Sequence, residues 1–154
     1  MNEYFADLHI HIGRTASGKP VKITGAKSLT LQNIIRDAAH VKGLDMISII
    51  DCHVPEVIQE IERLIELRRG FPCKDGGIRF GRVTLILGSE VEIYDDSSHG
   101  PIHVLTYFPD IEKMKMFSAW LNKHMKNVTL SSQRIYVDGK TLQTVVKQLD
   151  GLFV

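Results

Sequence analysis

The chain has 154 residues, of which 44% are hydrophobic and 24% are charged, and its formal net charge at pH 7 is +1. This length fits one globular domain, and the composition excludes a disordered or low-complexity protein. The near balance of 19 basic and 18 acidic side chains gives no overall attraction to nucleic acid or to an anionic membrane, although it leaves room for a local basic patch.

The cysteines and the N-terminus indicate an intracellular, soluble protein. Cys52 and Cys73 form no CxxC pair and no disulfide framework, so a reducing cytosol with two free thiols is the natural interpretation. The N-terminus lacks a basic segment followed by an apolar run, and no apolar stretch approaches the roughly 20 residues that cross a bilayer. We therefore predict a cytoplasmic protein.

The first third of the chain alternates between strand and helix patterns. Residues 3–10 (EYFADLHI) alternate in polarity and predict a strand, and residues 13–28, dense in Gly, Ser, Thr and Lys, predict a long loop. A helix is predicted over 30–42, from a threonine cap to a stop at Gly43. The apolar run of residues 45–51, bounded by aspartates, predicts a strand that is buried on both faces.

The alternation continues through the middle of the chain. A helix is predicted over 55–70, with proline at its start and two arginines near its end. A strand follows over 82–94 with a possible break at Gly88, then a strand over 102–108 and a helix over 110–128. This order indicates an α/β fold in which the strands pair in parallel and the helices lie outside the sheet.

The end of the chain predicts an incomplete fold. A last helix is predicted over 140–149, and the apolar sequence LDGLFV, residues 149–154, resembles a buried strand that stops as it begins. A natural domain rarely ends on such a run. We therefore expect residues 1–154 to be the N-terminal part of a longer protein.

Potential metal ligands recur at the ends of four successive predicted strands. In a parallel α/β fold these carboxyl ends converge on one site. They supply Asp7, His9 and His11, then Asp51, Cys52 and His53, then Glu90 and Glu92, and finally His103. The strand period of two predicts that Asp7, His9 and His11 point to the same face.

These residue types favour a hydrolytic metal centre. Two imidazoles two residues apart at a strand end can hold one ion, and the carboxylate of Glu90 can bridge it to a second. Nitrogen and carboxylate donors without a thiolate set suit Zn²⁺, Mn²⁺ or Fe²⁺. Two such ions activate water and stabilise charge on a phosphoryl oxygen. The pattern therefore predicts phosphoester hydrolysis, and we assign catalytic roles to Glu90 and Asp51.

Four segments resemble the motifs of the polymerase and histidinol phosphatase (PHP) superfamily of metal-dependent phosphoesterases. They are DLHIH (7–11), ISIIDCH (47–53), LGSEVEI (87–93) and IHVLTYF (102–108). The resemblance covers the chain and implies a PHP domain with two or three metal ions, whose distorted (β/α)7 barrel is present only in part and truncated at the C-terminus. It also implies that His9 and His11 hold one ion, that Glu90 bridges, and that His103 binds the second.

Within the superfamily, three sequence segments most resemble the N-terminal part of the endonuclease Q family: ADLHIHIGRTASGKP, DCHVPEVIQEIE and LILGSEVEIYD. This resemblance implies a DNA-repair endonuclease that nicks on the 5′ side of deaminated bases such as uracil and hypoxanthine. DNA is then the partner, and extrusion of the damaged base from the duplex is the general physical way to read it.

Two features depart from the family pattern. Its second motif has Asp followed directly by His, whereas here Cys52 intervenes, so either His53 or Cys52 fills the ligand position. Strand alternation points Asp51 and His53 together, which favours His53 as a metal ligand. The final Asp-x-His motif is absent from the chain, so we expect residues 1–154 alone to bind metal weakly and to be catalytically impaired.

Two other functions stay open from the sequence. One is a PHP-type small-molecule phosphatase similar to histidinol phosphatase, and the other is a non-catalytic PHP module, against which the intact histidines and Glu90 argue. The basic run RRGFPCKDGGIRFGR (68–82) can contact a nucleic-acid backbone, although such runs are more typical of a solvated surface.

Overall fold

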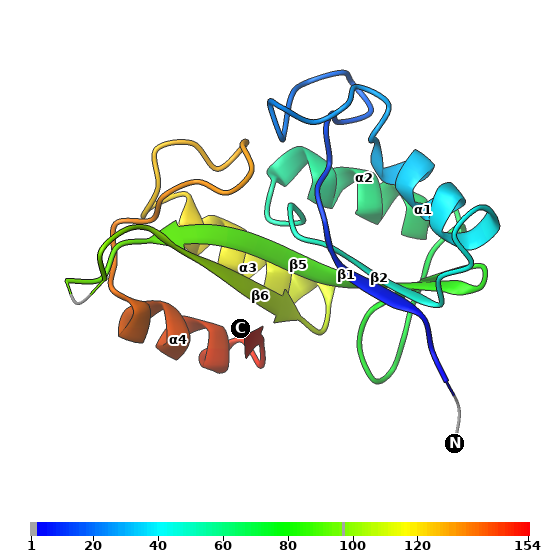
Figure 1. Ribbon diagram of the computed structural model, residues 1–154. Helices are drawn as coiled ribbons and strands as arrows, with labels where there is room; N and C mark the ends of the chain where they lie inside the picture. The colour runs from blue at the N-terminus through cyan, green and yellow to red at the C-terminus, as the bar shows by residue number, and fades with distance from the viewer. Residues whose placement is uncertain (1–2, 97) are drawn as a thin grey trace.

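The computed structural model describes residues 3–96 and 98–154, which form a mixed sheet with helices packed against it (Figure 1). The elements in chain order are β1 (Ala6–Ile10), α1 (Leu31–His40), β2 (Met46–Ile49), α2 (Pro55–Glu66), β3 (Phe71–Pro72), β4 (Ile78–Phe80), β5 (Val83–Ile93), β6 (Ile102–Phe108), α3 (Ile111–Leu121), α4 (Gly139–Gln148) and β7 (Leu152–Phe153). None of the helices in this part of the chain combines the length and apolarity needed to span a bilayer.

The strand order and directions explain where the site forms. β1, β2 and β5 pair in parallel, as predicted, and place their carboxyl ends at one edge of the sheet. β4 and β6 pair with β5 in the antiparallel direction, and β7 pairs in the same way with β6. The prediction of parallel pairing is therefore wrong for β6 and β7, and β4 was not predicted. The loop over 94–101 between β5 and β6 is too short for the crossover of a dozen or more residues that parallel pairing needs.

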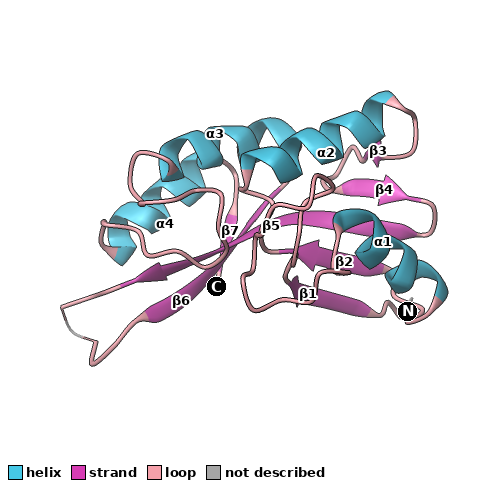
Figure 2. Ribbon diagram, turned by 90° about the horizontal axis from the view of Figure 1, so that it is seen from above, coloured by secondary structure: helices cyan, strands magenta, loops and turns pink. Residues whose placement is uncertain are grey.

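The described residues form an open sheet rather than a closed barrel. The strands follow the order β1-β2-β5-β4-β3, while β6 and β7 continue from the second half of β5. α2 and α3 run along the same side of the sheet in Figure 2. The mixed α/β architecture is confirmed, whereas the partial (β/α)7 barrel implied by the sequence resemblance is not.

α1 and β2 form where the capping residue and the pattern of apolar residues predict them. Thr30 caps α1 by accepting a hydrogen bond from the backbone N–H of Asn33. The apolar face of α1 then buries Leu31 and Ile34 against the core. β2 is buried on both faces, as predicted: Ile47 and Ser48, which point to opposite faces of the strand, are both 0% exposed.

The basic run belongs to a hairpin that the sequence analysis missed. β3 and β4 pair around a turn that contains Gly76 and Gly77, both with positive φ. The Asp-Gly-Gly sequence is a known signal for such a turn. All five basic side chains of the run are exposed: Arg68, Arg69, Lys74, Arg79 and Arg82. The hairpin lies beside the first residues of β5, at the opposite end of that strand from Glu90.

The final apolar run forms a strand, but an exposed one. Leu152 and Phe153 pair with Tyr107 and Thr106 of β6. Leu152 is 71% exposed and Val154 is 76% exposed, so the prediction of a buried strand is wrong for the described structure.

β5 runs without interruption through Gly88, so the predicted break is wrong. Instead, Gly88 lets the backbone that follows β2 approach β5 closely: Cys52 N–H donates to the Gly88 carbonyl at 3.0 Å, and Glu90 N–H donates to the Ile50 carbonyl at 2.8 Å. A Cβ atom at Gly88 would lie 2.5 Å from Ser48 Oγ. The glycine therefore permits the approach that holds residues 50–52 against the end of β5.

We expect Gly88→Ala to lower the free energy of unfolding by about 1–3 kcal/mol, because an added methyl group overpacks a fully buried contact. Urea denaturation measures this change. Gly100→Ala is the matched control, since a Cβ atom there meets nothing within 4 Å. Equal stability of the two variants would contradict the close approach.

Candidate metal centre

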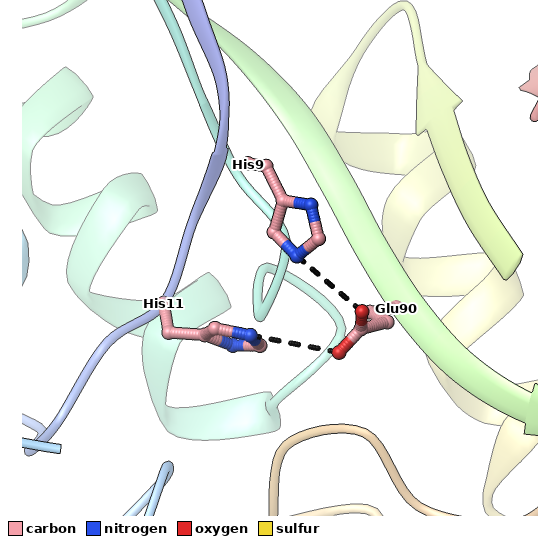
Figure 3. Close-up of side chains that lie close together, drawn as sticks. All are labelled: His9, His11 and Glu90. Carbon is pink, nitrogen blue, oxygen red and sulfur yellow. Dashed lines mark ion pairs between the residues drawn. The ribbon is translucent and has the colours of Figure 1, made fainter. Parts of the chain in front are cut away.

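The side chains of His9, His11 and Glu90 point toward one another near the carboxyl ends of β1 and β5 (Figure 3). His9 Nε2 lies 3.3 Å from Glu90 Oε1, and His11 Nε2 lies 3.5 Å from Glu90 Oε2. One ligand atom from each of the three side chains lies within 4.8 Å of the other two. The fold thus brings together three of the side chains assigned as metal ligands from the sequence.

The end of β1 is irregular, and this affects Asp7. The register with β2 shifts between Asp7 and Ile10, so β1 contains one residue more than its partner over this stretch. A bulge of this kind re-aims side chains. Asp7 accepts a hydrogen bond from the His9 backbone N–H at 3.2 Å and lies outside the ligand group. It lines a cavity of about 250 Å³ between β1 and α1, together with both histidines.

His103 contacts the same group from β6, which runs antiparallel to β5. Its Nδ1 lies 3.5 Å from Glu90 Oε1, and its Nε2 lies 3.5 Å from Glu92 Oε2. The prediction that His103 ends a parallel strand is wrong, because His103 is the second residue of β6. β6 is antiparallel and pairs His103 with Glu92, so its beginning meets the carboxyl ends of the parallel strands.

Asp51 orients His11 instead of facing the group directly. Its Oδ2 accepts a hydrogen bond from Ile12 N–H at 2.8 Å and lies 3.1 Å from His11 Nδ1. Burial raises the pKa of Asp51, but interactions with His11 and Ser131 outweigh it and leave this pKa below its ordinary value. Asp51 is therefore a carboxylate that favours the proton on His11 Nδ1 and leaves the lone pair of Nε2, on the side of Glu90, available to a cation.

His53 is fully buried, and protein atoms engage both of its ring nitrogens. Nδ1 lies 2.8 Å from Ser89 Oγ, and Nε2 lies 3.4 Å from the Leu130 carbonyl oxygen. Burial lowers the pKa of His53, and the nearby carboxylate of Asp51 offsets this only in part. These surroundings therefore favour the neutral form of the ring. Its assignment as a metal ligand stays a prediction.

Cys52, the other candidate for that position, lies in the apolar core and is 0% exposed. Burial raises the pKa of its thiol to about 12. Metal ligation by cysteine needs the thiolate, so these surroundings oppose a ligand role for Cys52.

We expect a thiol-alkylating reagent at pH 8 to modify Cys73, which is half-buried, while Cys52 stays unmodified. The protonated, inaccessible thiol of Cys52 is the reason. Mass spectrometry of the native and urea-unfolded protein measures this difference, with unfolding as the step that should release the second site. Rapid modification of Cys52 in the folded protein would contradict its placement.

Two serines that the sequence analysis did not select complete the group. Ser132 Oγ donates a hydrogen bond to Glu90 Oε2, and Ser131 Oγ lies 2.9 Å from His11 Nδ1. Burial raises the pKa of Glu90, but the Ser132 hydroxyl and the nearby histidines outweigh it, so the pKa lies below its ordinary value. Glu90 is consequently an anion at neutral pH.

This donor set fits a divalent cation. Two imidazole nitrogens and a carboxylate converge from His9, His11 and Glu90, and they are the ligand types that Zn²⁺, Mn²⁺ and Fe²⁺ accept. Among the described residues, the buried Asp51 Oδ1 has no hydrogen-bond partner. A carboxylate that supports a ligating histidine on one oxygen is typical of metal centres.

Comparisons with known proteins place the fold. No family model matches the chain. The chain is 53% identical over all 154 residues to YqxK, an uncharacterized protein of Bacillus subtilis, and covers 40% of it. It is 26% identical over 147 residues to the uncharacterized protein MJ0043 of Methanocaldococcus jannaschii, and covers 15% of it. The chain therefore spans less than half the length of either relative.

Two solved structures share the fold. One is the lesion-specific endonuclease PfuEndoQ of Pyrococcus furiosus, with a TM-score of 0.74, 23% identity, and coverage of 97% of this chain and 33% of that one. The other is endonuclease Q in complex with a 27-mer duplex substrate that carries an abasic lesion at the active site, also with a TM-score of 0.74. The chain is thus similar in fold to part of endonuclease Q.

Proposed function

We propose that this chain carries the metal centre of a DNA endonuclease of the endonuclease Q type, which nicks DNA on the 5′ side of deaminated bases. The convergence of His9, His11 and Glu90 is the observation that carries this proposal. Its occurrence in a fold similar to that of a lesion-specific endonuclease supports the choice of DNA over other phosphoesters.

Some of these side chains would bind a cation, and others orient the side chains that bind it. A divalent cation would be held by His9, His11 and Glu90. It would supply the polarisation of a phosphoryl oxygen and a bound water whose pKa is lowered. Asp51 fixes the ring of His11, and the Ser132 hydroxyl orients the Glu90 carboxylate. We further propose ligand roles for His103 and His53 at a second and a third ion.

The alternative is a histidinol-phosphatase-like enzyme that acts on a small molecule. The similarity in fold to a lesion-specific endonuclease supports DNA ahead of this alternative.

The test uses the full-length protein, Mn²⁺, and an end-labelled duplex with a single uracil. We expect one cut on the 5′ side of the uracil, no cut in the matching thymine duplex, and no cut after chelation of the metal. Hydrolysis of a phosphomonoester without DNA cleavage would favour the small-molecule phosphatase. Absence of both activities and of bound metal would favour a non-catalytic module.

The impairment expected for residues 1–154 is tested by the same assay. Alone, this segment should bind Mn²⁺ more weakly and nick the uracil duplex more slowly than the full-length protein does. Equal rates would contradict the expectation that further ligands come from another part of the protein.

A further inference from the structure

Two tyrosines and an arginine form an exposed cluster beyond the end of β5, which we call the platform (Tyr94, Arg134 and Tyr136). The guanidinium carbon of Arg134 lies 3.9 Å from the ring centroid of Tyr94 and 5.0 Å from that of Tyr136. Tyr94 is 43% exposed and Tyr136 is 54% exposed, and Arg134 is exposed as well. Three planar groups, one of them cationic, thus lie together at the surface, with the guanidinium over one face of each tyrosine ring.

Backbone hydrogen bonds attach the platform to the strand that carries the metal centre. Glu92 N–H donates to the Gln133 carbonyl at 3.1 Å, and Ile135 N–H donates to the Glu92 carbonyl at 2.9 Å. Residues 133–135 therefore run alongside β5, and Arg134 pairs with Glu92 in a parallel bridge. The same Glu92 contacts His103 through its side chain. The platform is consequently held in a fixed relation to the metal centre.

The spacing along β5 gives the distance between the platform and the metal centre. Tyr94 follows directly after Ile93, the last residue of β5, and lies four positions after Glu90. Four residues at about 3.3 Å each place the backbone of Tyr94 at most roughly 13 Å from that of Glu90. A stacked nucleic-acid strand rises about 3.4 Å per nucleotide, so this distance corresponds to about four nucleotides or fewer.

We propose that the platform stacks an unpaired base of the DNA strand, up to about four nucleotides from the phosphate that is cleaved. This inference rests on the proposed function and adds the path of the strand. Aromatic rings accept any base through its π-face, and an adjacent arginine adds attraction to the backbone. An enzyme that pulls a base from a duplex unpairs that base and leaves the opposite base without a partner, and a surface of this kind can accept such an unpaired base.

The test measures binding without cleavage. Fluorescence anisotropy gives the Kd of the full-length protein, in the presence of chelator, for a short labelled oligothymidylate and for an abasic strand of the same length. The double variant Tyr94→Ala with Tyr136→Ala should weaken oligothymidylate binding by roughly five- to 150-fold for each stack that is lost. Binding of the abasic strand should not change. Arg134→Lys, which keeps the charge but not the planar group, should show a smaller loss for oligothymidylate.

Tyr4→Ala is the matched control, because Tyr4 is 69% exposed before β1 and lies outside the platform. Unchanged thermal unfolding of each variant shows that the fold is intact. Equal losses for both strands, or no loss for either, would overturn the inference. A protein that fails to nick uracil DNA but still binds oligothymidylate through the platform would overturn the proposed function alone. A protein that nicks while the double variant binds normally would overturn the platform alone.

Discussion

Glu90→Gln is expected to weaken divalent-metal binding by at least roughly 100-fold and to reduce nicking by a larger factor. The carboxylate of Glu90 lies between His9, His11 and His103, with contacts of 3.3 to 3.5 Å to each. Loss of a group that merely supports a ligand typically costs 10–100-fold in metal affinity, so loss of the central anionic ligand should cost more. An amide also leaves the three imidazoles without the negative charge that makes a cation site favourable.

Isothermal titration with Mn²⁺ and the metal-to-protein ratio of the purified protein measure this effect. Glu60→Gln is the matched control, because this half-buried carboxylate of α2 accepts a hydrogen bond from Ala16 N–H at 2.6 Å and lies outside the ligand group. The control should bind metal as the unmodified protein does. Normal metal binding by Glu90→Gln would refute the proposed centre.

Sequence patterns predict the elements that depend on near neighbours. The threonine cap and spacing of apolar residues identify α1, and the unbroken apolar run identifies β2 as a buried strand. His9 and His11 are selected in the same way, since two imidazoles at alternate positions of a strand are a local signal. Glu90 is found because it lies in a strand with a recognisable motif. Each of these inferences needs only a short window of residues.

Strand direction and close approaches are not local properties, and the predictions that depend on them are wrong. Whether β6 runs parallel or antiparallel to β5 depends on the length of their connection, not on the pattern within either strand. Gly88 illustrates the same limit: in a strand, a glycine indicates a break or a close backbone approach. The packing of residues 50–52 against β5 shows that Gly88 marks a close backbone approach and not a break.

Ser131 and Ser132 show why part of the site was missed. They lie in the segment between α3 and α4, and Ser131 is 120 positions away from His11, which it contacts. The sequence around them, LSSQR, contains no metal motif and is typical of any polar loop. Their contacts follow only from the way in which residues 133–135 run beside β5 and carry this loop to His11 and Glu90.

Asp51→Asn is expected to weaken metal binding by about 10–100-fold without removing any ligand atom that faces Glu90. Asp51 is buried, and its Oδ2 serves both Ile12 N–H and His11 Nδ1. An amide oxygen in the place of Oδ2 carries no negative charge, so it holds the proton of His11 on Nδ1 more weakly, and the amide NH2 takes the buried position of Oδ1, which has no hydrogen-bond partner among the described residues. When Nε2 carries the proton instead, it cannot donate a lone pair to a cation. The misfit should also lower the free energy of unfolding by about 1–3 kcal/mol.

Two measurements separate the positioning role of Asp51 from a purely structural one. Nitrogen NMR of the histidine rings should report a shift of the His11 proton from Nδ1 toward Nε2 in Asp51→Asn, which loss of stability alone does not produce. Asp45→Asn is the matched control at the other end of β2, where the carboxylate accepts from Phe5 N–H at 3.0 Å and pairs with Arg82. It should leave the tautomer of His11 and the metal affinity unchanged. If Asp51→Asn instead keeps the Nδ1 proton and full metal affinity, the carboxylate supports the fold and not the metal centre.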